Sequence, residues 1–255
     1  MQGYQENEKD SREHTLVIEG RNAVLEALRS GKAIDKLFVL DGCQDGPVRT
    51  IIREAGKQDM ILNFVGKERL NQLSVTGKHQ GVIAYAAAYD YADVEDMLAL
   101  AQEKGEPPFL ILLDNIEDPH NLGAIIRTAN LAGAHGVIIP KNRAAGLTAV
   151  VARTSAGALN YTPVAKVTNM KQTIEKLKEQ GLWFACAAMD GEVMYRQNLK
   201  GPLGLVIGNE GNGVSRLVRE ACDFTVSIPM KGDIDSLNAS VAAGVLAFEV
   251  VRQRG

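Results

Sequence analysis

Five apolar runs in the second half of the chain constrain its fold more strongly than any other feature of the sequence. They cover residues 109–113, 136–139, 182–186, 203–207 and 224–228. Because apolar and polar residues do not alternate within the first four, the runs predict strands that are buried on both faces. Helix-like segments separate or follow the runs, at residues 121–132, 147–159, 170–180 and 237–252. This succession predicts a parallel sheet covered on both faces by helices, with ligands bound at the carboxyl ends of the strands.

The first part of the chain carries shorter and more polar signals. Helix-like segments cover residues 19–30, 47–56 and 67–73, and strand-like segments cover residues 36–40, 61–65 and 81–88. The acidic stretch that follows has a helix-like middle over residues 94–102, and it ends in two adjacent prolines, which often mark a boundary between folding units. We therefore expect a disordered lead over residues 1–13, a small α/β domain over 14–88, a linker over 89–106 and a larger parallel-sheet α/β domain over 107–255.

Composition narrows the class of protein. The chain has 255 residues, of which 45% are hydrophobic, as in globular proteins. It contains no apolar run long enough for a membrane helix, and its charged beginning is unlike a secretory signal, so we expect a soluble cytoplasmic protein. Its three cysteines are widely spaced without a C-x-x-C pair, and its four histidines form no metal-binding pattern. We therefore expect neither a disulfide framework nor a metal.

The net charge of −3 argues, taken alone, against a nucleic-acid partner, because such proteins usually carry a basic surface. The acidic residues are concentrated, however. Residues 90–106 contain six acidic residues and one lysine, so the remainder of the chain is weakly basic. The net charge of the whole chain therefore does not exclude a nucleic-acid partner.

Three polar loops follow the predicted strands, at residues 114–129, 206–214 and 228–240. The second loop holds Gly208, Gly211 and Gly213, whose order G-x-x-G-x-G differs from the G-x-G-x-x-G of dinucleotide sites, and the chain has no phosphate-binding G-x-x-x-x-G-K-[ST] motif. These glycines indicate instead that the backbone turns tightly or approaches another group closely. In the third loop, Ser236 could cap the final helix through its hydroxyl, whereas Asn238 has no comparable local role.

Together, the three loops resemble the signature motifs of the SpoU/TrmH family of RNA ribose methyltransferases, which belongs to the SPOUT superfamily. The matching segments are residues 121–129, 205–214 and 228–242. Residues 18–28 and 78–82 also resemble the substrate-binding domain of that family, so the resemblance covers about residues 14–253. It implies a trefoil-knotted domain, a smaller N-terminal domain like ribosomal protein L30e, and a homodimer whose active sites lie at the subunit interface.

The resemblance also implies the donor and the reaction. S-adenosylmethionine would supply a methyl group to a ribose 2′-hydroxyl, without a metal. The positions that match the donor site, or lie beside it in the same motifs, are Ile207, Gly208, Gly213, Ile228, Leu237 and Asn238. The positions that match the catalytic site are Asn121, Arg127, Glu210, Ser236 and Asn238.

Arg127 is the residue on which the expected chemistry depends. Because a guanidinium stays protonated at ordinary pH, we expect it to bind the phosphate beside the target ribose and to stabilise the developing oxyanion, not to act as a base. We expect Glu210 to orient Arg127 or another part of the site, and Ser236 and Asn238 to place the hydroxyl or hold the donor. Without the resemblance, Arg127 would be interpreted as a surface residue paired with Glu117 or Asp118.

The N-terminal domain is expected to select the RNA, and its resemblance favours a guanosine of large-subunit (23S) ribosomal RNA. The candidate RNA contacts are Arg12, Arg21, Asn22, Arg29 and Lys32. Transfer RNA remains an alternative substrate. A non-catalytic RNA-binding factor in ribosome assembly and a nucleotide-dependent metabolic enzyme are alternative functions, and the order of the glycines counts against the second.

Overall fold

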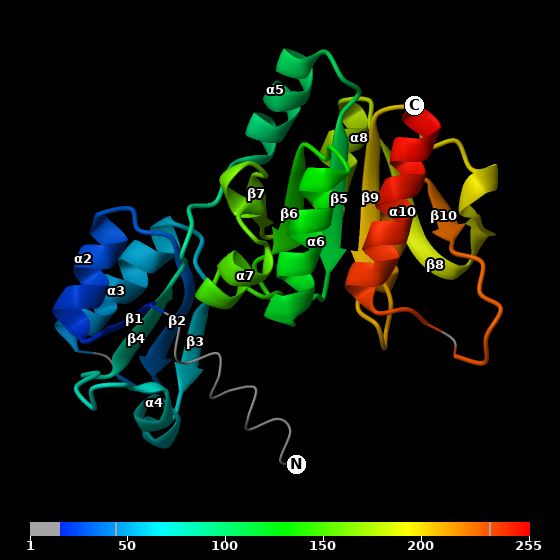
Figure 1. Cartoon of the computed structure of the whole chain (residues 1–255). Coiled ribbons are helices and arrows are strands. Elements are labelled where there is room, and N and C mark those ends of the chain that lie inside the picture. The colour runs from blue at the N-terminus through cyan, green and yellow to red at the C-terminus, as the bar shows by residue number, and fades with distance from the viewer. Residues whose placement is uncertain (1–15, 44, 235) are drawn as a thin grey trace. The chain divides into compact units, whose positions relative to one another are not determined.

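The computed structural model describes residues 16–43, 45–234 and 236–255, which form two compact units (Figure 1). Of these described residues, the first unit comprises those up to residue 90 together with 146–150, and the second comprises those from 91 to 145 and from 151 to 255. No helix within these described ranges is long and apolar enough to cross a membrane.

The first unit is a four-stranded sheet with helices on both faces. Its strands are β1 (Leu16–Glu19), β2 (Ile34–Leu40), β3 (Leu62–Val65) and β4 (Val82–Ala86), in the order β1-β4-β2-β3. Only β2 and β3 are parallel. On one face, α2 (Arg21–Arg29) and α3 (Gly46–Lys57) bury Val24, Leu28 and Ile51, and on the other face α4 (Lys67–Leu73) packs its two leucines against Ile83.

The helices and strands predicted for this unit are confirmed, apart from one strand that the sequence analysis missed. The segment 19–30 was expected to be a helix throughout, but β1 ends at Glu19 and α2 begins only at Arg21. Gly20 separates the two with a φ of 89°, a conformation that glycine adopts readily. A strand of four residues is too short to show a reliable periodicity, which explains the omission.

The second unit contains the predicted parallel sheet. Its strands are β5 (Phe109–Asp114), β6 (Gly136–Pro140), β7 (Val164–Val167), β8 (Trp183–Val193), β9 (Leu203–Gly208) and β10 (Phe224–Ser227). They are arranged in the order β10-β8-β9-β5-β6-β7, and every pair is parallel. Both central strands, β5 and β9, are buried along almost their whole length, as their uninterrupted apolar sequences predict.

Helices cover both faces of this sheet. The helices α5 (Val94–Lys104), α8 (Met170–Glu179) and α9 (Arg216–Ala221) share one hydrophobic core with the strands. On the other face, α6 (Pro119–Leu131) and α10 (Ala239–Arg254) pack side by side, visible as the green and red helices in Figure 1. The expected arrangement of a parallel sheet between helical layers is thus confirmed.

Three details of the second unit differ from the sequence-based expectations. Strand β7 was not predicted, and the helix expected over residues 147–159 is a short α7 (Ala149–Thr154) followed by a 3-10 turn, η1 (Ala158–Asn160). The helix expected within the segment 89–106 is present as α5, but its Met97 is fully buried in the core of the second unit, so this helix is part of that unit's packing, where a linker was expected. Its acidic residues lie on the outside of this helix, which is why composition alone suggested a linker.

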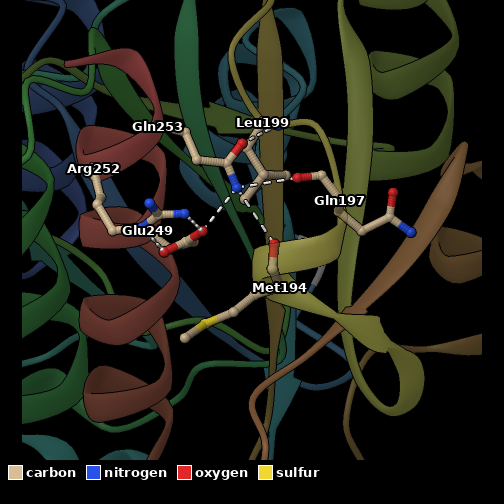
Figure 2. Close-up of polar contacts among 6 residues, drawn as sticks. All are labelled: Met194, Gln197, Leu199, Glu249, Arg252 and Gln253. Carbon is tan, nitrogen blue, oxygen red and sulfur yellow. Dashed lines mark hydrogen bonds and ion pairs between the residues drawn. The ribbon is translucent and has the colours of Figure 1, made fainter.

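The last turn of α10 is anchored to the loop that follows β8 and the 3-10 turn η2 (Met194–Arg196) (Figure 2). The Gln253 amide nitrogen donates to the carbonyl oxygens of Met194 (3.4 Å) and Gln197 (3.0 Å), and its oxygen accepts the N–H of Leu199 (2.9 Å). Glu249 accepts a third bond from the same amide (2.8 Å) and two from Arg252 (2.8 Å each). These contacts fix the distal end of the helix.

The buried His135 makes the stability of the second unit depend on pH. Its Nδ1 accepts the N–H of Phe109 (3.0 Å) and its Nε2 lies 3.1 Å from Glu106, while burial lowers the pKa of the imidazole below its ordinary value. The unfolded chain therefore binds a proton at a pH where the folded chain does not. We expect the free energy of unfolding to fall as the pH drops below about 6.5, by up to about 1.4 kcal/mol for each pKa unit of difference.

Urea unfolding between pH 5 and pH 8 measures this effect. A His135→Asn variant, which retains an acceptor but does not titrate, should be less stable at pH 8 and should lose this part of the pH dependence. Parallel pH curves for the variant and the original protein would contradict this role for His135.

Candidate functional site

The parallel ladder places two of the three polar loops side by side. Asp114, the last residue of β5, pairs with Gly208, the last residue of β9. The first loop continues from Asp114 into α6, and the second continues from Gly208 towards α9. Because all strands of this sheet run in the same direction, the loop after β10 leaves from the same edge. The candidate site is therefore at the carboxyl edge of the sheet, where such folds bind ligands.

Three predicted site residues meet there, one from each loop. Asn121 donates to Oε1 of Glu210 (3.0 Å), and Asn238 donates to the same oxygen (2.6 Å) and to the side-chain oxygen of Asn121 (2.9 Å). The N–H of Ala239 is a third donor to this Glu210 oxygen (3.2 Å). The cluster therefore joins segments that are far apart in the sequence, and its carboxylate and amides are suited to binding and orienting polar groups.

Glu210 is carried by a tight turn. The N–H groups of Asn209 and Gly213 each donate to the carbonyl oxygen of the other, at 3.2 Å and 2.8 Å. Gly208 packs so closely on this turn that a Cβ atom at its position would lie 2.1 Å from the carbonyl carbon of Gly213. The prediction that these glycines allow a close backbone approach is thus confirmed.

Asn238, and not Ser236, caps the final helix. The Asn238 side-chain oxygen accepts the N–H groups of Ser240 (3.0 Å) and Val241 (3.3 Å), which satisfies two donors at the start of α10. The expectation that Ser236 could be the cap, with Asn238 inside the helix, is therefore wrong by two residues. Ser236 is exposed and does not cap the helix, so its hydroxyl is accessible to a ligand.

Arg127 lies on α6, exposed and apart from the cluster. It follows Asn121 by six residues, which on an α-helix corresponds to about 9 Å along the axis and a side-chain direction about 120° away. The alternative pairing of Arg127 with Glu117 or Asp118 is not formed in the described part of the chain; instead, Asp118 caps α6 by accepting the N–H of His120 (2.9 Å). Of the two roles expected for Glu210, a bond to Arg127 is not formed within the described residues, and the contacts with Asn121 and Asn238 agree with its orienting another part of the site.

The other residues predicted for the donor site differ in accessibility. Gly208, Gly213, Ile228 and Leu237 are partly exposed at the carboxyl edge, where a ligand can reach them. Ile207 is only 2% exposed, so its side chain is buried beneath the helices that cover the sheet. No group of three or more His, Cys, Asp or Glu side chains in the described ranges could hold a metal ion.

The candidate RNA contacts of the first unit are divided. Arg12 lies outside the described residues. Arg21 is half-buried, donates from Nε to the carbonyl oxygen of Gln80 (3.0 Å) and forms an ion pair with Asp45, so it holds the fold together. Asn22, Arg29 and Lys32 are exposed on or beside α2.

Sequence reasoning missed two residues that shape the site. Asn209 accepts the N–H of Gly211 (2.9 Å) and donates to the carbonyl oxygen of Asn115 (3.3 Å), and Asp114 accepts the N–H of Ser215 (2.6 Å). A signal for each was present. An asparagine two residues before a glycine is typical of a side-chain-stabilised turn, and Asp114 is a lone carboxylate at the end of an apolar run.

Two protein-family models match this chain. The SpoU rRNA Methylase family matches residues 108–248, and the family described as RNA 2′-O ribose methyltransferase substrate binding matches residues 17–92. The first match covers more than half of the chain and contains all the members of the hydrogen-bonded cluster.

Individual relatives agree with these matches. YacO of Bacillus subtilis (strain 168), assigned by its name to the TrmH family of tRNA/rRNA methyltransferases, is 48% identical over 246 residues, which are 96% of this chain and 98% of YacO. The crystal structure of the SpoU methyltransferase AviRb from Streptomyces viridochromogenes, in complex with AdoMet, has a TM-score of 0.60 and 26% identity, and the likeness covers 96% of this chain and 93% of AviRb. A solved structure described as an RNA 2′-O ribose methyltransferase has a TM-score of 0.52 and 26% identity, and covers 96% of this chain and 91% of its own.

The close packing at Gly208 predicts a large effect of a single methyl group. Gly208→Ala should destabilise the protein by about 1–3 kcal/mol, because the new Cβ meets backbone atoms that cannot move aside without opening the turn. Gly211→Ala is the matched control, since its Cβ would meet its nearest neighbour at 3.4 Å, an ordinary contact. Denaturant unfolding measures both variants, and equal stabilities would contradict the packing argument.

Proposed function

Because this chain belongs to the SpoU/TrmH family of RNA methyltransferases, we propose that it transfers a methyl group from S-adenosylmethionine to a ribose 2′-hydroxyl of RNA. The observation that carries this proposal is the cluster of Asn121, Glu210 and Asn238, which joins all three predicted motifs in one place. The ribose hydroxyl is the group named by the substrate-binding family model and by one of the similar structures.

The described loops fit the proposed donor. AviRb was crystallised with AdoMet, and the turn after β9 in this chain offers exposed backbone around Gly208 and Gly213. The half-buried side chains of Ile228 and Leu237 provide apolar surface of the kind that an adenine ring requires. When bound, S-adenosylmethionine would supply a methyl group on a positively charged sulfur, which keeps the bonding electron pair as the methyl group leaves.

The residues of the chain would bind and align the hydroxyl. A neutral ribose hydroxyl is a weak nucleophile, so its oxygen must be held in line with the methyl carbon while its proton is removed. We assign this alignment to Asn238 and the free hydroxyl of Ser236, with Glu210 holding the amides of Asn121 and Asn238 in place. Arg127 would bind the neighbouring phosphate through two hydrogen bonds from its planar guanidinium. It would also stabilise the negative charge that develops on the ribose oxygen.

The position of Arg127 supports a site that is shared between two subunits. Within one chain Arg127 forms no hydrogen bond to the cluster among the described residues, whereas a second copy could bring its Arg127 to the cluster of the first. The layer of α6 and α10 leaves apolar surface exposed, with Leu131 at 66% and Val241 and Phe248 at 49% each. We propose that this surface forms the homodimer interface. The trefoil knot implied by the family resemblance stays a prediction.

We propose a guanosine of large-subunit ribosomal RNA as the target. The match of residues 17–92 to a substrate-binding family model supports a structured RNA substrate that is selected by the first unit. Transfer RNA is the second candidate, because the name of YacO includes both RNA classes. Transfer of labelled methyl to unmodified ribosomal and transfer RNA, followed by mapping of the modified ribose, decides between them.

The role of Arg127 predicts which variants lose activity. Arg127→Ala should lower kcat/KM for methyl transfer by about 10²–10³-fold, and Arg127→Lys by at least about tenfold, because lysine keeps the charge but loses the fork. The matched control is Arg196→Ala, since Arg196 is exposed beside the distal end of α10. Near-normal turnover in Arg127→Lys would contradict a bidentate contact.

The proposed interface predicts the oligomeric state of a charged variant. Phe248→Asp should convert the dimer to a monomer, because a carboxylate would be buried in an apolar contact. Leu217→Asp is the control, since Leu217 is similarly exposed (55%) but lies on α9, which covers the opposite face of the sheet. Sedimentation velocity distinguishes the two states, and a Phe248→Asp variant that remains dimeric would place the interface elsewhere.

A further inference from the structure

Asp114 is a buried carboxylate that has no part in the proposed reaction. It is 6% exposed at the end of β5, and its Oδ2 accepts the N–H of Ser215 at 2.6 Å. None of the described cationic side chains forms an ion pair with it. Burying a carboxylate without a cation costs free energy, and a neutral asparagine of the same shape could also accept a hydrogen bond. A purely structural contact of this kind would therefore not require a carboxylate.

The bond from Asp114 closes the loop that carries Glu210. Ser215 follows the turn of residues 209–213 and begins the approach to α9, so its attachment to Asp114 fixes the far side of the loop. Asn209 fixes the near side, because its amide donates to the carbonyl oxygen of Asn115 (3.3 Å). Asn115 itself has a φ of 60°, which turns this carbonyl out of the strand direction. The end of β5 thus holds the loop after β9 at two points.

The residues between these two points are those assigned to the donor and to the reaction. Gly208 and Gly213 offer the backbone proposed to contact the donor, and Glu210 at the apex holds Asn121 and Asn238. A hydrogen bond to a charged acceptor is stronger than one to a neutral acceptor, so the carboxylate of Asp114 holds the loop more firmly than an amide would. Loss of the charge would allow this loop to shift while the sheet stays intact.

We propose that Asp114 is a positioning residue, which acts with Asn209 to keep the turn after β9 in the conformation that receives S-adenosylmethionine. This inference rests on the proposed function, because it assigns the donor to that turn. Neither residue touches the reacting atoms. Their effect reaches the donor through the backbone of residues 208–215.

The test is titration calorimetry of the protein with S-adenosylmethionine, together with urea unfolding of the same samples. Asp114→Asn should raise the Kd for S-adenosylmethionine about tenfold, and Asn209→Ala should raise it severalfold. The matched control is Asp223→Asn. Asp223 also accepts a backbone N–H, from Phe184 at 2.8 Å, and it pairs with Lys178, but it precedes β10 at the opposite edge of the same sheet. Its variant should lose stability and keep the original Kd.

Each outcome separates this inference from the function on which it rests. An original protein that binds no S-adenosylmethionine overturns both. Binding by the original protein with an unchanged Kd in Asp114→Asn and Asn209→Ala overturns the positioning role alone. An equal rise in Kd for Asp223→Asn also overturns it, because the effect would then be general destabilisation. If Asp114→Asn does not fold, Asn209→Ala gives the decisive comparison with Asp223→Asn.

Discussion

The parallel ladder between β5 and β9 is the constraint on which the rest of the second unit depends. Six consecutive residues pair in register, from Phe109 with Leu203 to Asp114 with Gly208. Both strands lie in the middle of the sheet and are buried by helices on its two faces, so a slip of one residue would exchange the side chains that the shifted strand presents to the two helical layers and disrupt the packing on both. The register therefore fixes where the loops after β5 and β9 begin, and with them the contacts of Asn121, Glu210 and Asp114.

The sequence predicted the layers of this unit because long buried strands leave an unmistakable apolar signal. It did not predict β7, whose four residues include the charged Lys166 and so form no apolar run. The acidic segment was interpreted as a linker because its charges are visible in the sequence, whereas the burial of Met97 depends on contacts with a distant strand. Local composition describes the exposed side of a helix and says little about what the other side contacts.

The candidate site shows the same limit at the level of single residues. Motif resemblance identified Asn121, Glu210 and Asn238, and the structure brings them within hydrogen-bonding distance. It could not show that Asn238, and not Ser236, caps α10, because either side chain can cap a helix and only the backbone decides between them. Arg21 presents the reverse case. Its charge suggested RNA, but its contacts with Gln80 and Asp45 are needed within the unit.

The helix α10 is held at both of its ends. Its first turn is capped by Asn238, and near its last turn the Arg254 guanidinium donates to the carbonyl oxygens of Pro107 (3.0 Å), Pro108 (3.3 Å) and Gly201 (2.8 Å). These three carbonyls precede β5 and β9 at the edge of the sheet opposite the candidate site. Helix ends commonly fray, and their amide hydrogens then exchange with solvent without unfolding of the rest of the domain. A helix that is tied to both edges of the sheet has no free end from which to fray, so its slowest amides can open only when the central strands themselves separate.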